Sequence, residues 1–500
     1  MNSLDIYSVP KGEELVKDFE MQVEGKEVPL HYARVSAYPI NRRWPGHQRT
    51  LEQTELASFA SFAITRSVNV TLTSTKEFKE VVIRPLSKKI TPKVEGQKIT
   101  FTLPESGQYT VELDGPHNAL HIFADEQKDF NVNFNNSKLR YFGPGLHEVG
   151  NIILHDDEIL FIDAGAIVFG QVLAQNANNI KIIGHGILDG SKNKEVYLHQ
   201  FNEEDKARRD KGFAVLNVKR FDTIRLIKCD NVFIEGITLR DSLLYTIRPI
   251  CCNNLTINNV KIIGNWRYNS DGIDMHNCCD VNISNCFIRT FDDCICVKGF
   301  DYVLPPEQMQ NSNDLRDRAC RIKVENCVLW CDWNTTLEIG AETRAEEIAY
   351  ITFNNCDIIH NFSAACDITS VDYAYIHDIV YNDIRVEESP TQMRILQTND
   401  NQTFEDIPNP PVYGCVLRCV VQRHPEYSGN DPRSSVVKNV TFSNISLSGR
   451  MMACYFVGSD KDHVSGPIKI ENFRCNGKHL TNSEDLRLWV DSFIEDVTIC

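Results

Sequence analysis

The sequence predicts an all-β protein in which a β-sandwich over residues 1–135 precedes a parallel β-helix over residues 136–500. From Met21 to Asp129, short runs of alternating apolar and polar residues are separated by turn clusters such as SGQ and DGPHN. This pattern is typical of an antiparallel sandwich. Beyond residue 136, short apolar strands recur with an asparagine at a fixed place, which indicates a solenoid.

The expected strands of the sandwich follow one another closely. In chain order, the runs are HYARVSAYPI, FASFAIT, SVNVTLTST, EVVIRPLS, KITFTLPES, QYTVELDG and ALHIFAD. A period of two directs one face of each strand to a core and the other to solvent. None of the runs contains a cluster that indicates catalysis.

The expected coils of the solenoid are marked by segments such as NNVKI, SNCFI, ENCVL and NNCDI. The repeated asparagines are Asn259, Asn285, Asn326, Asn355, Asn382, Asn444 and Asn472. Most neighbours lie 26 to 29 residues apart, and longer gaps contain the polar segments 301–319 and 387–435. Because asparagine tolerates left-handed backbone and can bond to its equivalent one coil away, we expect the first four to form one ladder. The cysteines that follow three of them are expected to be stacked core thiols.

Composition and charge exclude several classes of protein. The longest apolar stretches fall far short of the ~20 residues that a membrane span needs, so no membrane partner is expected. The balance of 52 Lys and Arg against 68 Asp and Glu gives a net charge of −16. Because this charge repels phosphate backbones, we also expect no nucleic-acid partner.

The cysteines and the first residues indicate the cellular compartment and whether a metal site is expected. None of the 18 cysteines belongs to a C-x-x-C pair, so we expect neither a metal site nor a cofactor. The start MNSLDIYSVPKGEELVKDFE has neither the basic nor the apolar segment of a secretory signal. The sequence therefore predicts a reducing, cytoplasmic location, or a secreted protein if a leader has been removed.

Acidic side chains interrupt one pair of coils. Asp271 and Asp274 lie on one coil, and Asp292 and Asp293 follow nearly one full turn later. Because neighbouring strands are ~4.8 Å apart, carboxylates stacked in this way repel one another and raise at least one pKa. A turn, a solvated corner or a set of calcium ligands are the alternatives. A carboxylic acid beside a carboxylate is also the chemistry of glycoside hydrolysis.

These residues carry a resemblance to a known family. The segments NSDGID from Asn269, DDCI from Asp292 and KG from Lys298 resemble the N-T-D-x-x-D and D-D-C-I-x-x-K-S-G motifs of glycoside hydrolase family 28, the polygalacturonases. The first domain and the segment VENCVLWCDWNTTLEIG are similar to the dextranases and isopullulanases of family 49. The resemblance implies a right-handed β-helix and an inverting mechanism. It also implies that Asp292 is the general acid and that Asp271 and Asp293 hold the attacking water.

The sequence departs from the polygalacturonase pattern in the substrate groove. Thr335 and Thr336 replace a His-Gly pair, Glu338 replaces a serine, and the R-I-K motif gives way to a stretch that contains Asp367 and Asp372. Losing the cations that bind galacturonate weakens anion recognition, so we expect a neutral, hydroxyl-rich sugar. The candidate substrate-binding residues are Asn269, Asp274, Lys298, Arg248, Arg267, Trp266, Tyr245 and Glu338.

The sequence thus predicts a glycosidase that acts on poly- or oligosaccharides. Three alternatives remain open. The first is a polygalacturonase-type pectin hydrolase in which Arg248, Arg267 and Lys298 have taken over carboxylate recognition. The second is a β-helix polysaccharide lyase, which would need calcium. The third is a glycan-binding protein without catalysis, such as a tailspike-like adhesin.

Overall fold

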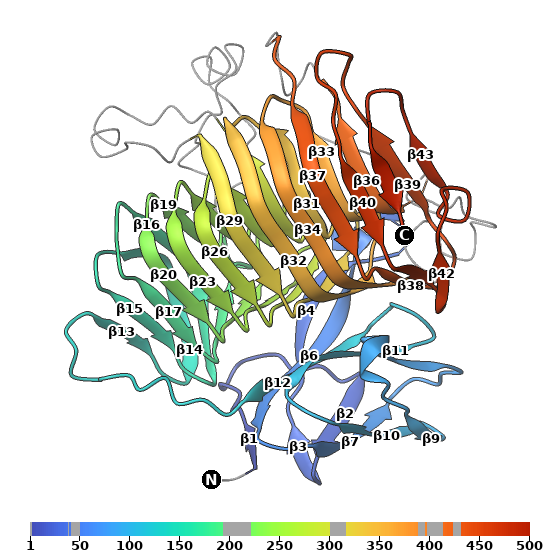
Figure 1. Cartoon of the computed structure of the whole chain (residues 1–500). Coiled ribbons are helices and arrows are strands. Elements are labelled where there is room, and N and C mark those ends of the chain that lie inside the picture. The colour runs from blue at the N-terminus through green and yellow to red at the C-terminus, as the bar shows by residue number, and fades with distance from the viewer. Residues whose placement is uncertain are drawn as a thin grey trace.

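The chain is described from a computed structural model, which covers residues 3–38, 40–41, 51–193, 222–300, 317–388, 396–397, 414–423 and 432–500. Two small sheets are followed by a long parallel sheet of 31 strands that winds into a solenoid (Figure 1). Across these residues the only helical elements are two single 3₁₀ turns, η1 (Leu51–Gln53) and η2 (Leu86–Lys88). The predicted fold class is therefore confirmed. Within the same residues, no helix is long and apolar enough to cross a membrane.

The first two sheets face each other across a shared core. One contains β1 (Leu4–Ile6), β4 (His31–Ser36), β6 (Thr54–Ile64), β8 (Val81–Arg84), β11 (Gly107–Leu113) and β12 (Leu120–Glu126). The other contains β2 (Phe19–Val23), β3 (Lys26–Val28), β7 (Val68–Ser74), β9 (Lys93–Glu95) and β10 (Lys98–Leu103). Their pairings are antiparallel, except that β6 and β12 run parallel. Successive side chains of a strand point to opposite faces, so along β2 every second residue is buried in the shared core and the residues between them are exposed.

The solenoid begins with β13 (Leu139–Phe142), β14 (Gly145–Leu154), β15 (Ile159–Ile162), β16 (Ala166–Gln175) and β17 (Lys181–Gly184). Each later coil contributes one strand to each of three parallel faces, which we call sheets I, II and III. Sheet I contains β20 (Asp230–Glu235), β23 (Asn253–Asn258), β26 (Cys279–Ser284), β29 (Arg318–Glu325), β32 (Glu347–His360), β34 (Tyr375–Glu387), β37 (Val436–Ser443), β40 (Ile468–Glu471) and β44 (Val497–Ile499).

Sheets II and III complete each coil. Sheet II contains β18 (Ile187–Asp189), β21 (Thr238–Arg240), β24 (Lys261–Ile263), β27 (Phe287–Thr290), β30 (Val328–Cys331), the later parts of β32 and β34, β38 (Ser446–Ser448) and β41 (Phe473–Cys475), which pairs with β42 (Lys478–Leu480). Sheet III contains β19 (Ile224–Ile227), β22 (Ile247–Ile250), β25 (Ile273–His276), β28 (Ile295–Gly299), β31 (Leu337–Thr343), β33 (Ala364–Ser370), β36 (Cys415–Val421), β39 (Ala453–Val457) and β43 (Leu488–Val490). A separate pair joins β5 (Ile40–Asn41) to β35 (Leu396–Gln397).

The repeated asparagines form the turn between sheets I and II. Six of the seven have a positive φ between 50° and 57°, as expected for the residue type that best tolerates left-handed backbone. Asn382 lies one residue earlier, and Asp383 takes the left-handed position there with φ 53°. The Asn355 amide donates to Asn326 at 2.7 Å, whereas Asn285 donates to Asn258 at 2.8 Å. The ladder therefore also uses the residue before each left-handed position.

The solenoid interior is filled by stacked apolar side chains. Cys286, Cys327 and Cys356, which follow three of the turn asparagines, lie within this core. Sixteen of the 18 cysteines are buried, and all 18 are free thiols. Small polarisable thiols fit between closely spaced coils in the same way as alanine or valine.

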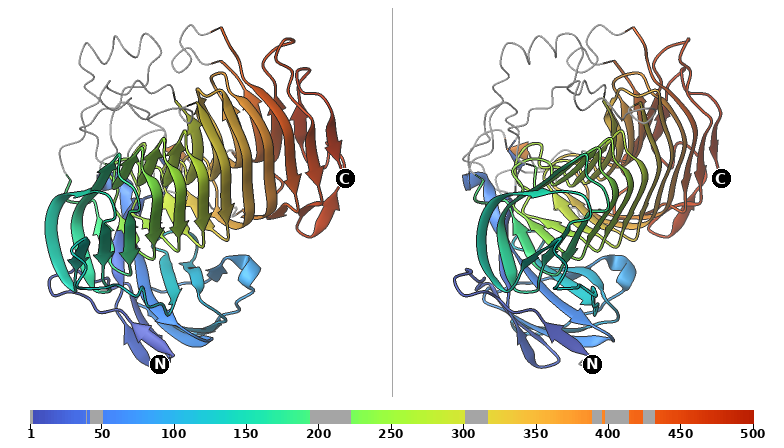
Figure 2. Two further views of the ribbon diagram at one scale, coloured as in Figure 1. Left: turned by 60° about the vertical axis from the view of Figure 1, so that its left-hand side comes forward. Right: turned by 90° about the vertical axis from the view of Figure 1, so that its left-hand side faces the viewer.

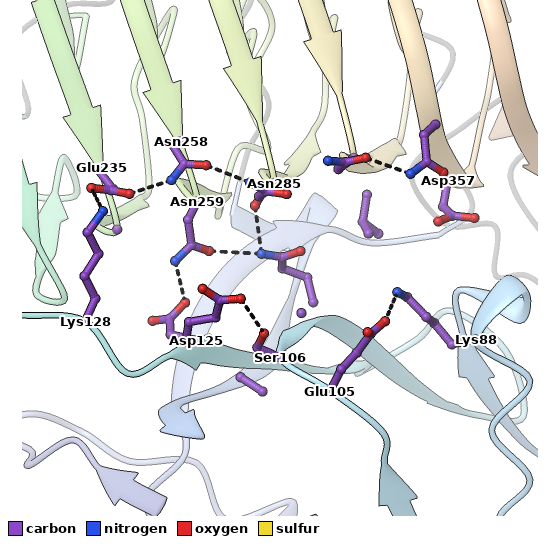
Figure 3. A pocket seen from close by; sticks show the side chains of 18 of the residues that line it. Lys88, Glu105, Ser106, Asp125, Lys128, Glu235, Asn258, Asn259, Asn285 and Asp357 are labelled. Atoms are coloured by element: carbon purple, nitrogen blue, oxygen red, sulfur yellow. Dashed lines mark hydrogen bonds and ion pairs between the residues drawn. The ribbon is translucent and has the colours of Figure 1, made fainter. Parts of the chain in front are cut away.

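The sandwich packs along sheet II (Figures 1 and 2). Phe59 and Phe123 of the sandwich meet Ile263, Phe287 and Trp330 of the solenoid in one apolar cluster. Beside this cluster a cavity of about 650 Å³ opens between the sandwich and the asparagine turns (Figure 3). The cavity lies at the turns between sheets I and II, whereas the clustered aspartates lie at the turns between sheets II and III.

Candidate active site

The aspartates occupy the turns that lead into two neighbouring strands of sheet III. Asp271 comes just before β25, and Asp292 and Asp293 come between β27 and β28. The Gly272 N–H donates to the Asp293 carbonyl at 2.8 Å. A Cβ at position 272 would lie 2.3 Å from the Cys294 carbonyl oxygen, so only glycine allows the two turns to approach this closely. The predicted stacking of the two coils is present.

Asp271 and Asp292 are both buried, and burial raises the pKa of each. Their exposed fractions are 2% and 5%. Burial, with the charges of Asp292 and Asp274, holds the pKa of Asp271 well above its usual value. Burial and the neighbouring Asp293 raise the pKa of Asp292 to about 6. Both carboxyls are thus candidates to carry a proton near neutrality.

The carboxylate of Asp292 is held at both oxygens. The Asn269 N–H donates to Oδ2 at 2.9 Å, and the Asn334 amide donates to Oδ1 at 3.0 Å. Asn269 has a positive φ of 57°, which turns its N–H toward the next coil. Of the predicted substrate-binding residues, Asn269 therefore positions an aspartate. Among the described residues, Oδ1 of Asp271 has no hydrogen-bond donor.

Thr335 connects Asp293 to Glu338. Its hydroxyl oxygen lies 2.5 Å from Oδ1 of Asp293 and 2.6 Å from Oε2 of Glu338. A hydroxyl has one proton to donate, so the three groups are satisfied when Glu338 is protonated and donates to Thr335, which donates to Asp293. Burial and the charge of Asp293 raise the pKa of Glu338 well above its usual value, in agreement with this arrangement.

Lys298 supplies positive charge at the centre of the cluster. Its ammonium lies 3.9 Å from Asp271, 3.8 Å from Asp274 and 3.9 Å from Asp293. Glu342, which the sequence analysis did not single out, lies nearer at 3.2 Å. Burial alone would lower the pKa of Lys298, but the surrounding carboxylates raise it well above its usual value. Lys298 therefore remains charged.

Asp274 lies beside Lys298 and His276 on β25. It is fully buried, and its Oδ2 lies 3.3 Å from Nε2 of His276. Burial alone would raise its pKa, but Lys298 and His276 outweigh that effect and lower it. The His276 ring stacks on Phe300 with centroids 4.6 Å apart. Asp274 is thus an anion held beside Lys298 and His276.

Arg248 on the preceding coil and Arg267, which lies in the same turn as Asp271, both form ion pairs. Arg248 lies 2.6 Å from Asp222 and 4.7 Å from the ring centroid of Tyr245, over its face. Arg267 pairs with Asp241 and covers the ring of Trp266 at 4.0 Å. Trp266 is only 3% exposed, so its ring supports Arg267.

Two arginines that the sequence analysis missed stand on later coils. Arg418 of β36 holds Asp367 with two contacts of 2.7 Å, and Arg344 holds Asp372 at 2.9 Å. The negative charge expected from these two aspartates is thus compensated. No local signal marks the pairs, because the members of the Asp367–Arg418 pair are 51 residues apart. Only the register Asp367↔Arg418 between β33 and β36 brings them together.

Two groups in this cluster have the ligand types that metals prefer. They are Asp271, Asp274 and Cys296, and Asp293, Cys296 and Glu338. The ligand atoms within each group lie within 4.8 Å of one another. Lys298 contacts a carboxylate of each group, and a second cation there would be repelled. A site without metal therefore stays our prediction.

Comparison with known proteins supports the resemblance. A family model described as Glycosyl hydrolases family 28 matches residues 169–404, which include every aspartate of the cluster. The chain resembles this family. A polygalacturonase from Gossypium barbadense is 33% identical over 149 residues, which cover 30% of this chain and 33% of that protein. A probable polygalacturonase from Vitis vinifera is 30% identical over 93 residues, which cover 17% of this chain and 19% of that protein. The chain thus matches about a third of the length of the Gossypium relative and less of the Vitis relative.

A solved structure shares the whole architecture. Dex49A from Penicillium minioluteum superposes with a TM-score of 0.66, covering 100% of this chain and 96% of that one, at 14% identity. At this identity the likeness concerns the fold. It confirms the predicted combination of an N-terminal sandwich with a right-handed parallel β-helix.

Proposed function

We propose that this protein is a glycoside hydrolase that cleaves poly- or oligosaccharides with inversion of configuration. The observation that carries the proposal is the buried set of Asp271, Asp292 and Asp293 on adjoining coils around one lysine. Such a set places a protonated carboxyl and a hydrogen-bonded carboxylate within reach of one glycosidic bond. The family 28 match over these residues supports it.

In this mechanism Asp292 protonates the leaving oxygen. A pKa of about 6 lets a carboxyl both give and regain a proton near neutrality. Asp271 holds its proton more tightly, so it suits the orientation of water through its Oδ1. Asp293, held by Thr335, accepts the proton of that water. Inversion needs carboxyls ~6.5–9.5 Å apart, so the side chains must spread beyond the ~4.8 Å coil step.

We infer that the preferred substrate is neutral and rich in hydroxyl groups. Arg248, Arg267 and Arg418 each already form an ion pair, and Lys298 is shared among four carboxylates. An anionic chain would have to compete with these partners, whereas hydroxyl groups can donate to the carboxylates. The curated relatives are polygalacturonases, so galacturonan is the second candidate.

One assay separates these functions. The purified chain is incubated with α-glucan oligosaccharides, other neutral oligosaccharides and oligogalacturonides, and new reducing ends are measured. The proposal expects neutral chains to be cleaved, kcat to fall by about 10² to 10⁴ in the Asp292→Asn and Asp293→Asn variants, and the exposed control Asp462→Asn to be unaffected. Proton NMR of the first product, before mutarotation, reports inversion or retention.

The remaining outcomes favour other functions. A clear preference for oligogalacturonides would refute the proposal of a neutral substrate but would still support a hydrolase. Unsaturated products together with loss of activity in a chelator would indicate a lyase. Binding without any new reducing ends would indicate a glycan-binding protein.

We also infer a reducing location, the cytoplasm, since the eighteen cysteines are free thiols. Reducing conditions keep such thiols from oxidation. Titration of thiols in protein isolated from its native source tests this inference. Paired cysteines in that protein would contradict it.

A further inference from the structure

Two aromatic side chains are exposed near the C-terminal end of the solenoid. Tyr455 of β39 is 41% exposed and Trp489 of β43 is 54% exposed. The two residues are register partners in a parallel pair. Partners in a parallel ladder project from the same face, so the two rings lie one coil apart on one side of sheet III.

That face also carries the candidate active site. A single line of register partners runs along sheet III, and we call it the site column. Its members, in coil order, are Asp274, Cys296, Glu338, Asp367, Arg418, Tyr455 and Trp489. The strand neighbours of Tyr455, Cys454 and Phe456, point into the core and are fully buried. The side chains of the site column therefore project outward from the solenoid.

We propose that Tyr455 and Trp489 form a distal subsite that stacks on sugar rings of a chain bound at the aspartates. This inference rests on the proposed function. Tyr455 is four coil steps and Trp489 five coil steps from Cys296. At ~4.8 Å per step, the two residues lie ~19 and ~24 Å from Cys296 along the solenoid. A sugar there is several units away from the bond that breaks.

The chemistry of the column suits a neutral chain. A pyranose ring has an apolar C–H face that packs on an aromatic ring, while its hydroxyl groups stay in water. Between the aspartates and the aromatic pair stands Arg418, whose charge is balanced by Asp367 through two 2.7 Å contacts. The Arg418 side chain is 24% exposed, so it can still border a bound chain. The distal subsite therefore increases affinity for longer chains and does not select for charged ones.

The test compares two pairs of exposed aromatic residues. Tyr455 and Trp489 are changed together to alanine, and the control changes Tyr350 and Tyr375, which are 53% and 47% exposed on sheet I. Each protein is assayed on α-glucan oligosaccharides and oligogalacturonides. One set of chains is too short to span the four coil steps from Cys296 to Tyr455, and the other is long enough to exceed them.

On the long chains that the parent cleaves, we expect the Tyr455→Ala/Trp489→Ala variant to raise KM about fivefold to tenfold with kcat unchanged. Its kinetics on short chains and the kinetics of the control should equal those of the parent. In the double variant, phenylalanine in place of alanine at position 489 retains a ring, so KM on long chains should return part of the way to that of the parent. Equal kinetics of parent and variant on long chains, or equal losses on short and long chains, would overturn the subsite.

Failure of the proposed function would look different, because the parent itself would release no reducing ends from any chain. In that case calorimetric titration with the same long chains tests the subsite. Weaker binding by the Tyr455→Ala/Trp489→Ala variant than by the parent and the control supports it. Equal binding by all three, or no binding by the parent, refutes it.

Discussion

At the residue scale, the candidate site is a balance between crowded carboxyls and one lysine. Asp271, Asp292 and Glu338 all have raised pKa values because burial removes water from their anions and neighbouring carboxylates repel them. Lys298 opposes each of these shifts. The titrations of these groups are therefore coupled, and substitution of one member changes the pKa of those members that its charge affects.

The first prediction concerns Asp292. A general acid works only when protonated, so a pKa of about 6 means that Asp292 is in its active form below pH 6 and that kcat falls as the pH rises through 6. Asp292→Asn should lower kcat by about 10² to 10⁴ and remove this basic limb. Stopped assays from about pH 4 to 9, where carboxyls and histidines titrate, measure both effects.

Asp271→Asn is the matched comparison, because Asp271 is the other carboxyl with a raised pKa. It should lower kcat and keep the limb near pH 6. If Asp271→Asn removed the limb while Asp292→Asn retained it, the roles of acid and water-holding group would be exchanged.

The second prediction concerns Lys298. Lys298→Met removes the charge that lowers the pKa of Asp292, so that pKa rises and the basic limb of kcat moves to higher pH by roughly one unit. The variant should also lose about 3–5 kcal/mol of unfolding free energy, since buried carboxylates lose their partner. Lys438→Met, at a partly exposed ion pair with Glu495, is the control. A limb that stays in place or moves to lower pH would refute the role given to Lys298.

At the scale of the element, each coil is shaped by one left-handed residue at the turn between sheets I and II. Asparagine holds this place in most coils, and aspartate takes it at position 383. Both residue types adopt positive φ more readily than others. The sharp turn then sends the next residue, such as Cys327, into the core.

The third prediction tests this turn at Asn326, whose φ is 57°. Asn326→Ala should cost about 1–2 kcal/mol of unfolding free energy, because alanine lacks the short polar side chain whose local hydrogen bonds let asparagine adopt left-handed backbone. Asn326→Gly should cost less, although both variants lose the bond from the Asn355 amide. Urea unfolding followed by circular dichroism measures the difference. Equal losses for alanine and glycine would show that the amide bond, not the backbone, is what the asparagine supplies.

At the scale of the whole molecule, buried ion pairs join the sandwich to the solenoid. Asp125 of the sandwich contacts Lys261 of β24 at 2.6 Å. Glu112 contacts Arg84 at 2.9 Å, and Arg84 also reaches Glu387 of the solenoid at 2.5 Å. Burial alone would raise the pKa values of Asp125 and Glu112. Lys261 outweighs it for Asp125, and His360 together with Arg84 outweighs it for Glu112, so both pKa values are lowered to about 2.

The fourth prediction follows from these depressed pKa values. Their stabilising contribution is complete above the unfolded pKa values of about 4 and is lost as the pH falls toward 2. Lys261→Met should lower the unfolding free energy by about 3–5 kcal/mol near neutrality and flatten its fall between about pH 4 and 2. Lys93→Met, at an exposed pair, is the control. An unchanged acid profile in Lys261→Met would exclude this pair as a source of acid sensitivity.

Much of the fold could be predicted because its patterns are local in the chain. The period of two in the sandwich and the recurring asparagine in the solenoid each follow from backbone geometry that a few residues dictate. The stacking of Asp271 with Asp292 and Asp293 was predictable for the same reason, since their spacing is nearly one coil. Asn382 shows the limit of this reasoning, because the neighbouring Asp383 fills the left-handed position equally well.

The sequence by itself therefore determined the fold class, the order of the two folded units and the cluster of aspartates. The tertiary structure alone decided how that cluster is balanced. Arg418 reaches Asp367, Lys298 reaches Glu342, and Tyr455 and Trp489 extend the site column, although no spacing in the chain marks these relations. The physical reason is that ion pairing, burial and register depend on distances between coils. Loops of different length separate the coils, so these distances cannot be inferred from spacing in the sequence.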